Sequence, residues 1–356
     1  MKRILAWVLA ALMLLNLCAC AQTSRDTAAK EEVKTAYTAE TGKPAPQETK
    51  TEEAKTTAGP TETGENTETD GPTPLMWKVT DTLGHHLYLF GTIHVGDKRN
   101  ETVLTRVSSV LDSCDALAVE FDMVAYEKNT QQAMEDMIPY VLTDGSDITD
   151  YMPEDLYKRA SELVQQDGID PGILEIYNLA MWSQIVDNAV QDIYSDLDSE
   201  YAMDSLLIHH AYKKNLPVLD VESASFQMAL LNSFENELYL LMIQSTLDSM
   251  DTYNDDLNEL YEYWLSGDRE TFWEYLANDI DEEGTEEYTK EQLALVEDYN
   301  RKLVDERNLG MRDKALEYLA SGDTVFFAVG AAHMANEAGL VQLMIDAGCT
   351  VEQIQY

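Results

Sequence analysis

Two short stretches decide the fold, LFGTIH at Leu89–His94 and AVGAAH at Ala328–His333. Each is the end of an apolar strand followed by Gly-x-x-His, and each continues into a helix and a second strand. A cysteine, Cys114 or Cys349, precedes each closing strand. The chain therefore carries an internal βαβ-like repeat. Residues just past the carboxyl end of a strand line the crevice in which α/β proteins bind ligands, so His94 and His333 are candidate site residues.

The surrounding pattern predicts an α/β fold with a small mixed β-sheet core, built from the two Gly-x-x-His repeats. Strand patterns fall at 76–81, 86–90, 116–121, 217–222, 324–329 and 350–354, the first two forming a hairpin. A large, mostly helical insertion of about 125–320 lies between the repeats. Its large apolar and aromatic residues, Tyr261, Trp264, Phe272 and Phe226 among them, are expected in the core; a lid over the crevice is the alternative.

The first 19 residues read as a signal peptide. Lys2 and Arg3 precede an apolar run at 4–17 that is too short to span a bilayer comfortably. The run ends in LCAC at 17–20, which resembles a bacterial lipobox and predicts acylation of Cys20. A plain signal peptide is the alternative, and Cys18 fits the lipobox pattern less well. The N-terminus therefore predicts export and lipid anchoring on the outer face of the bacterial cell membrane.

Residues 20–74 form a lipidated N-terminus and tether with few apolar side chains, too few to offset the entropy of ordering the segment. We therefore expect a disordered stalk there. The folded domain is expected at 75–356, which is long enough for one large domain.

Charge and motif content exclude several functions. The chain has 66 Asp and Glu against 24 Lys and Arg, a formal net charge of −42, which argues against nucleic acid and anionic lipid as direct partners of the domain. It has no Cys-x-x-Cys, His-Glu-x-x-His, Gly-x-Ser-x-Gly or P-loop motif. We expect Cys114 and Cys349 to be buried free thiols, with a disulfide as the alternative.

The motifs GTIH at 91–94, VEFD at 119–122 and GAAH at 330–333 resemble those of the TraB/GumN family. That family includes the Tiki membrane proteases and is similar in core to erythromycin-esterase and ChaN-like proteins. The resemblance covers most of 75–356, with further landmarks at Asp204, Glu222, Gln227, Arg307 and Asn308. Two positions depart from the family. Ala202 stands where the family has Gly, which puts the local role of Asp204 in doubt, and Asn336 stands where Gly is usual, which need not disturb a turn.

The resemblance implies a metal-dependent peptidase. Two imidazoles and a carboxylate can hold a divalent ion, with manganese, cobalt and zinc all suited, and leave a position open for water. We assign His94 and His333 as ligands and Glu120 as ligand or general base, with Glu222 competing for the base role. Arg307 is assigned to an oxyanion or a substrate carboxylate. The structural alternatives are a salt-bridged or helix-capping Glu120 and a solvated Arg307.

Two functions follow from these assignments. The first is a surface-anchored, metal-dependent hydrolase acting on peptide or ester bonds, with a peptide or small-molecule substrate. The second is a non-catalytic lipoprotein with the same fold that binds a peptide or pheromone.

Overall fold

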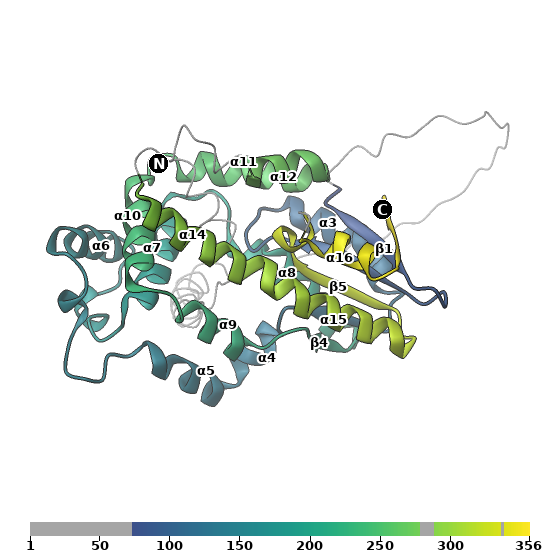
Figure 1. Ribbon diagram of the computed structural model, residues 1–356, viewed down its shortest axis with the longest axis horizontal. Coiled ribbons are helices and arrows are strands. Elements are labelled where there is room, and N and C mark those ends of the chain that lie inside the picture. The colour runs from purple at the N-terminus through teal and green to yellow at the C-terminus, as the bar shows by residue number, and fades with distance from the viewer. Residues whose placement is uncertain (1–72, 278–287, 336–337) are drawn as a thin grey trace, which may run out of the picture. The chain divides into compact units, whose positions relative to one another are not determined.

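One mixed β-sheet forms the centre of the computed structural model, which describes residues 73–277, 288–335 and 338–356 (Figure 1). Its strands are β1 (Met76–Thr80), β2 (His86–Thr92), β3 (Ala116–Val119), β4 (Val218–Asp220), β5 (Val325–Gly330) and β6 (Thr350–Gln353). Their order in the sheet is β4-β3-β5-β2-β1-β6. The strands β4, β3, β5 and β2 run parallel, and β1 is antiparallel to both of its neighbours.

The two repeats are interleaved. The first runs from β2 through α3 (Arg99–Leu111) to β3, and the second from β5 through α16 (Leu340–Asp346) to β6. The opening strands β2 and β5 are neighbours, and their crossovers leave in opposite directions along the sheet. Right-handed crossovers then place the two helices on opposite faces. The buried residues agree: α3 packs in one apolar core and α16 in the other.

Alternating side chains of the central strands divide between these cores. Phe90 and Phe326 enter the core shared with α3 and the helical region, while Leu89 and Phe327 enter the core beneath α15 and α16. The central strands are therefore buried on both faces, as expected of parallel strands. The α/β prediction is confirmed.

The middle of the chain is mostly helical, as the sequence predicts, and β4 interrupts it. Its helices are α4 (Met123–Lys128), α5 (Thr130–Met137), α6 (Glu154–Gln166), α7 (Leu179–Tyr194), α8 (Met203–Lys214), α9 (Ala224–Leu231), α10 (Asn236–Asp248), α11 (Tyr253–Ser266), α12 (Arg269–Ala277) and α14 (Lys290–Asn300), followed by α15 (Glu306–Ser321). Local caps fix several starts; the Asn178 side chain, for example, accepts the N–H of Met181 at the start of α7. Figure 1 shows α6, α7 and α10 grouped beyond one end of the sheet, with α15 and α16 across the strands.

Two details of the sequence prediction differ from the structure. Phe226, expected in the core, is 48% exposed near the start of α9, because this helix turns its other side, with Gln227 and Met228, inward. Cys114 is buried and Cys349 only half-buried, and both are free thiols. Three strands separate the closing strands β3 and β6, which holds the two thiols apart.

The ordered contacts of the domain begin just before the predicted boundary at Leu75. The N–H of Thr73 donates to the carbonyl of Leu265, and the hydroxyl of Tyr356 donates to the carbonyl of Pro74. The proposed signal peptide, Cys20, the tether up to residue 72 and Asn336 lie outside the described residues. Among the described residues, no helix is both long and apolar enough to cross a membrane.

Candidate active site

The parallel strands bring the predicted site residues to one edge of the sheet. In register, Thr92 of β2 pairs with Gly330 of β5, and Val119 of β3 lies between β5 and β4. The carboxyl ends of these four strands therefore meet at the same edge. Glu222 follows β4, Glu120 follows β3, and the two Gly-x-x-His turns follow β5 and β2. This edge is the crevice position at which α/β sheets bind ligands.

The first of these turns holds His94 against the start of α8. The Nδ1 atom of His94 lies 2.7 Å from Oδ2 of Asp204, and both side chains are buried. A backbone bond from Met203 N–H to the carbonyl of Ile93 fastens the turn to the helix. Ala202 has φ −53° and ψ 128°, a conformation open to any residue, so its departure from the family's glycine leaves Asp204 in place.

The second turn holds His333 against α15. The Nδ1 atom of His333 lies 2.7 Å from Oδ1 of Asn308, and the imidazole is fully buried. The amide nitrogen of Asn308 donates to the carbonyl of Ala338, which identifies Oδ1 as the acceptor. The His333 proton is therefore on Nδ1, and Nε2 carries a lone pair.

The Nε2 atoms of both histidines are buried, and neither has a hydrogen-bond partner among the described residues. Buried polar atoms in folded proteins nearly always have a partner. Two such exceptions on neighbouring turns, each with the opposite ring nitrogen held by an acceptor, make this edge the candidate ligand site.

Glu120 lies between these histidines and Arg307. Its Oε1 accepts the N–H of Gly330 at 2.8 Å and lies 3.9 Å from Nε2 of His333. Its Oε2 accepts hydrogen bonds from Arg307 at 2.6 Å and from Gln227 at 2.9 Å. Glu120 therefore forms the salt bridge that the structural alternative predicted. Its other oxygen, Oε1, faces His333.

Arg307 is buried between two carboxylates rather than solvated. Its guanidinium donates to both oxygens of Glu222 and to Glu120, and its Nη1 donates to the carbonyl of Leu303. Leu303 belongs to the π-helix η7 (Arg301–Asp305), which joins α14 to α15. A π-helical turn is rare and is often found at functional sites. Here it immediately precedes the helix that carries Arg307 and Asn308.

These contacts fix the charges at the site. Burial raises the pKa of Glu120, but Arg307, His333, His94 and the Gly330 N–H outweigh burial and lower this pKa to about 2. Burial and then Arg307 lower the pKa of His333 to about 3, against the attraction of Glu120. Burial also opposes the charge on His94, but the Asp204 carboxylate outweighs it and raises the pKa of His94. Glu120 is therefore ionised and His333 neutral at physiological pH.

The donor chemistry of these residues fits a divalent metal ion. Neutral imidazoles with Nδ1 held by a carboxylate or amide are the usual histidine ligands, and an ionised carboxylate is a usual third ligand. Two ligands about 2.1 Å from a tetrahedral ion lie about 3.4 Å from each other. The 3.9 Å between Glu120 Oε1 and His333 Nε2 is close to that value. No group of three His, Cys, Asp or Glu side chains within the described ranges is already arranged to hold an ion.

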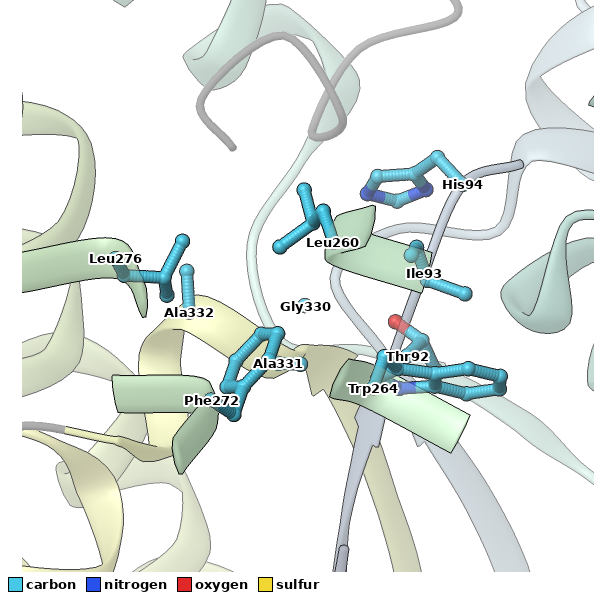
Figure 2. Close-up of a pocket in the computed structure, with 10 residues that line it drawn as sticks. All are labelled: Thr92, Ile93, His94, Leu260, Trp264, Phe272, Leu276, Gly330, Ala331 and Ala332. Carbon is cyan, nitrogen blue, oxygen red and sulfur yellow. The ribbon is translucent and has the colours of Figure 1, made fainter. Parts of the chain in front are cut away.

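A small apolar pocket opens beside His94 (Figure 2). Its walls are the two turns, including Ile93 and Ala331, and side chains of α11 and α12, including Trp264 and Phe272. The indole N–H of Trp264 donates to the carbonyl of Gly91, which ties α11 to the first turn. Trp264 and Phe272 are buried, as expected of core residues. They also line the pocket at the strand-end crevice, the position that the lid alternative gave them.

A family model described as the TraB/PrgY/gumN family matches residues 75–353. The chain belongs to this family. A search of curated proteins and a search of solved structures each find no match. The family match covers the whole sheet, both Gly-x-x-His turns and α15, so it includes every residue of the site described above.

The sequence alone left two contributors without a role. Asn308 and Gln227 were named from the sequence only as landmarks of the family resemblance. In the structure, Asn308 orients His333, and Gln227 donates to both Glu120 and Glu222. A ligand histidine needs an acceptor for its second nitrogen, so an Asn or Asp partner for each histidine was a foreseeable requirement. The remaining histidines lie elsewhere: His85 pairs with Asp81 in the hairpin and His210 with Asp112 near the end of α8.

Proposed function

We propose that this TraB/PrgY/gumN-family chain is a metal-dependent hydrolase of peptide or ester bonds. The observation that carries the proposal is that the Nε2 atoms of His94 and His333 are both buried without a hydrogen-bond partner among the described residues. Asp204 and Asn308 each hold the opposite ring nitrogen, so the direction of both Nε2 atoms is fixed. An ionised carboxylate, Glu120, lies beside them.

In this proposal His94, His333 and Glu120 hold a divalent ion, with manganese, cobalt and zinc as the candidates. The ion, when bound, would lower the pKa of a water molecule and polarise the substrate carbonyl. Glu120 is better suited to bind the ion than to act as a base, because a carboxylate with a pKa of about 2 accepts protons weakly at neutral pH. Glu222, at the next strand end, is therefore the stronger candidate for the general base.

We assign Arg307 a positioning role in place of direct contact with an oxyanion. Each nitrogen of its guanidinium donates to a protein oxygen, and the side chain is only 3% exposed. It keeps Glu120 ionised and fixes the separation of Glu120 and Glu222. Removing one partner of such a buried set would leave an uncompensated charge, so all three residues act together.

The same proposal includes export and anchoring. The apolar run at 4–17 and the LCAC sequence at 17–20 support cleavage before Cys20 and acylation of its thiol. The chain would then be a lipoprotein on the outer face of the bacterial cell membrane, and the tether would separate the hydrolase domain from the lipid.

Non-catalytic binding of a peptide is the second candidate. Two observations favour it: no three-ligand group is preformed among the described residues, and Arg307 is already neutralised by carboxylates. A site of this kind could hold a peptide beside the apolar pocket without cleaving it.

Peptide cleavage by the purified full chain separates the two functions. A mixed peptide library is incubated with wild type, His94→Ala and His333→Ala, and with His85→Ala as the control, whose imidazole lies in the hairpin. Mass spectrometry should find products with wild type and the control, none with the site variants, and none after chelation until metal is restored. If wild type binds peptides but leaves them uncleaved with each of the three metals, the result would favour the binding function and contradict the hydrolase.

A further inference from the structure

The apolar pocket beside His94 belongs to the strand edge that carries the proposed site. Ile93 and His94 come from the first turn, and Ala331 and Ala332 from the second (Figure 2). The opposite wall consists of Leu260 and Trp264 of α11 and Phe272 and Leu276 of α12. A group bound here therefore lies next to both histidine turns.

The lining of the pocket carries no formal charge other than any on His94. Apart from that imidazole and the hydroxyl of Thr92, its side chains are aliphatic or aromatic. This is a marked difference in a chain with 66 acidic residues and a net charge of −42. An acidic or basic group would lose its hydration there without gaining a counter-charge, whereas an aliphatic group would be stabilised by leaving water.

The pocket is small, and its α11 wall is fixed. Its volume is about 20 Å³, enough for one water molecule or one methyl group. Trp264 is bonded to the Gly91 carbonyl, and the hydroxyl of Tyr261 donates to Asn100 at 2.7 Å. These bonds hold α11 against the first turn and against α3, so the pocket has a fixed depth.

We infer that this pocket is a specificity subsite that takes a very small, uncharged aliphatic side chain of the substrate, such as the methyl group of alanine. The inference rests on the proposed function only in placing that side chain next to the bond to be cleaved. Selectivity for size follows from the fixed wall, and selectivity against charge follows from the lining.

Peptide binding tests the subsite without requiring turnover. Three fluorescein-labelled hexapeptides, glycine throughout except for one central Ala, Phe or Asp, are titrated against the full chain by fluorescence anisotropy. The Ala peptide should bind about fourfold more tightly than the other two, because burying one methyl group contributes roughly that factor in affinity. Equal affinities for the three peptides would overturn the subsite.

Changing the size of the pocket gives a second, independent readout. Phe272→Ala enlarges it, so the Phe peptide should gain about tenfold and approach or exceed the Ala peptide. Phe234→Ala is the matched control, since Phe234 packs against Tyr299 away from the pocket. Ala332→Leu fills the pocket and should weaken binding of the Ala peptide, with Ala133→Leu in α5 as its control. A preference unchanged in both pocket variants, with melting curves confirming that they fold, would overturn the inference.

The experiments test the hydrolase proposal and the subsite proposal independently. Preferential binding of the Ala peptide without cleavage would support the subsite and contradict the hydrolase. Metal-dependent cleavage at any residue alike would support the hydrolase and contradict the subsite.

Discussion

The two site histidines differ in the residue that orients them. Asp204 gives His94 a charged partner, and Asn308 gives His333 a neutral one. The pKa of His94 is accordingly raised, while that of His333, buried beside Arg307, is lowered to about 3. One imidazole is thus held by charge and the other by an amide, but both direct Nε2 to a buried position.

Replacing Asp204 by Asn tests this orienting contact. Asp204→Asn keeps the shape of the side chain but removes its charge, and we expect metal affinity to fall by about 10- to 100-fold. Asp81→Asn is the matched control, because Asp81 contacts the half-exposed His85 in the hairpin at 3.1 Å. Calorimetric titration of both variants with zinc or manganese measures the effect. Equal affinity in the two variants would show that Asp204 does not orient a ligand.

The site residues could be predicted from the sequence because strand ends follow from local patterns. Those patterns placed His94 and His333 after strands and Glu120 and Glu222 at the ends of strands, and parallel strands bring such positions together. The hydrogen-bond partners could not be predicted in the same way. Gln227 meets Glu120 across 107 residues of sequence, and this contact depends on how α9 is rotated in its packing.

At the scale of elements, the two turns pack directly on each other at Gly91. Neither Gly91 nor Gly330 has a positive φ, so a left-handed backbone is not the reason for glycine at position 91. A Cβ atom at Gly91 would lie 3.0 Å from the Cα of Ala331 and 3.1 Å from its Cβ. The glycine is needed for close approach between the two halves of the repeat.

Gly91→Ala should therefore push the turns apart. We expect a loss of about 1–3 kcal/mol in the free energy of unfolding, together with loss of metal binding as His333 shifts. Gly310→Ala in α15 is the control, since nothing lies within 4 Å of its added Cβ, and it should gain about 0.5–1 kcal/mol. Urea denaturation measures both changes. A Gly91→Ala variant as stable as wild type would mean that the turns tolerate separation.

The helical region contains a buried carboxyl group at Asp187 in α7. It accepts one hydrogen bond, from Thr246 of α10, at 2.6 Å, and is 6% exposed. Burial raises its pKa to about 7 against the lowering effect of Thr246. The folded protein therefore favours the protonated form at pH values where the unfolded chain has already lost that proton.

The sign of the pH dependence follows from this shift. The unfolded pKa is about 3.9, so the contribution of Asp187 to stability is fully present below that pH, falls as pH rises from about 4 to about 7, and is absent above. Asp187→Asn should remove that slope and exceed wild type by a few kcal/mol, on the order of 2–4, at pH 8. Urea unfolding at pH 4 to 8 checks this, with the exposed Asp192→Asn on the same helix as control. Parallel pH profiles for wild type and Asp187→Asn would refute the buried-acid assignment.

The strands of the sheet could be predicted from the sequence, but their order could not. The hairpin β1–β2 and the strands β3, β5 and β6 lie within a few residues of their predicted ranges, because alternating and apolar runs are local. The insertion of β5 between β2 and β3 joins segments more than 200 residues apart. No local pattern encodes such a pairing, and it is this pairing that places the two histidine turns side by side.

At the scale of the whole molecule, the strong acidity and the predicted anchor have separate roles. The net charge of −42 opposes direct contact of the domain with anionic lipid, so membrane attachment in our proposal depends on acylation alone. Among the described residues, Thr73 and Pro74, the last two residues of the predicted tether, contact Leu265 and Tyr356 of the domain.

Cys20→Ala should release the protein from the membrane. Without the thiol there is no acyl chain to supply membrane affinity, so the variant should be found in the medium or accumulate as an uncleaved precursor. Fractionation and intact-mass measurement of the mature chain check this, with Cys114→Ala as the control because that thiol is buried in the domain. Normal processing and normal membrane association of Cys20→Ala would rule out lipidation at this residue.

The metal content of the purified chain tests the central proposal most directly. The full chain is loaded with manganese, cobalt or zinc, freed of excess metal and measured by mass spectrometry of the elements, beside His85→Ala and a His94→Ala/His333→Ala double variant. We expect about one ion per chain in wild type and in His85→Ala, and almost none in the double variant. Wild type without bound metal under all three conditions, or a double variant that binds as much as wild type, would contradict a metal site at the two histidine turns.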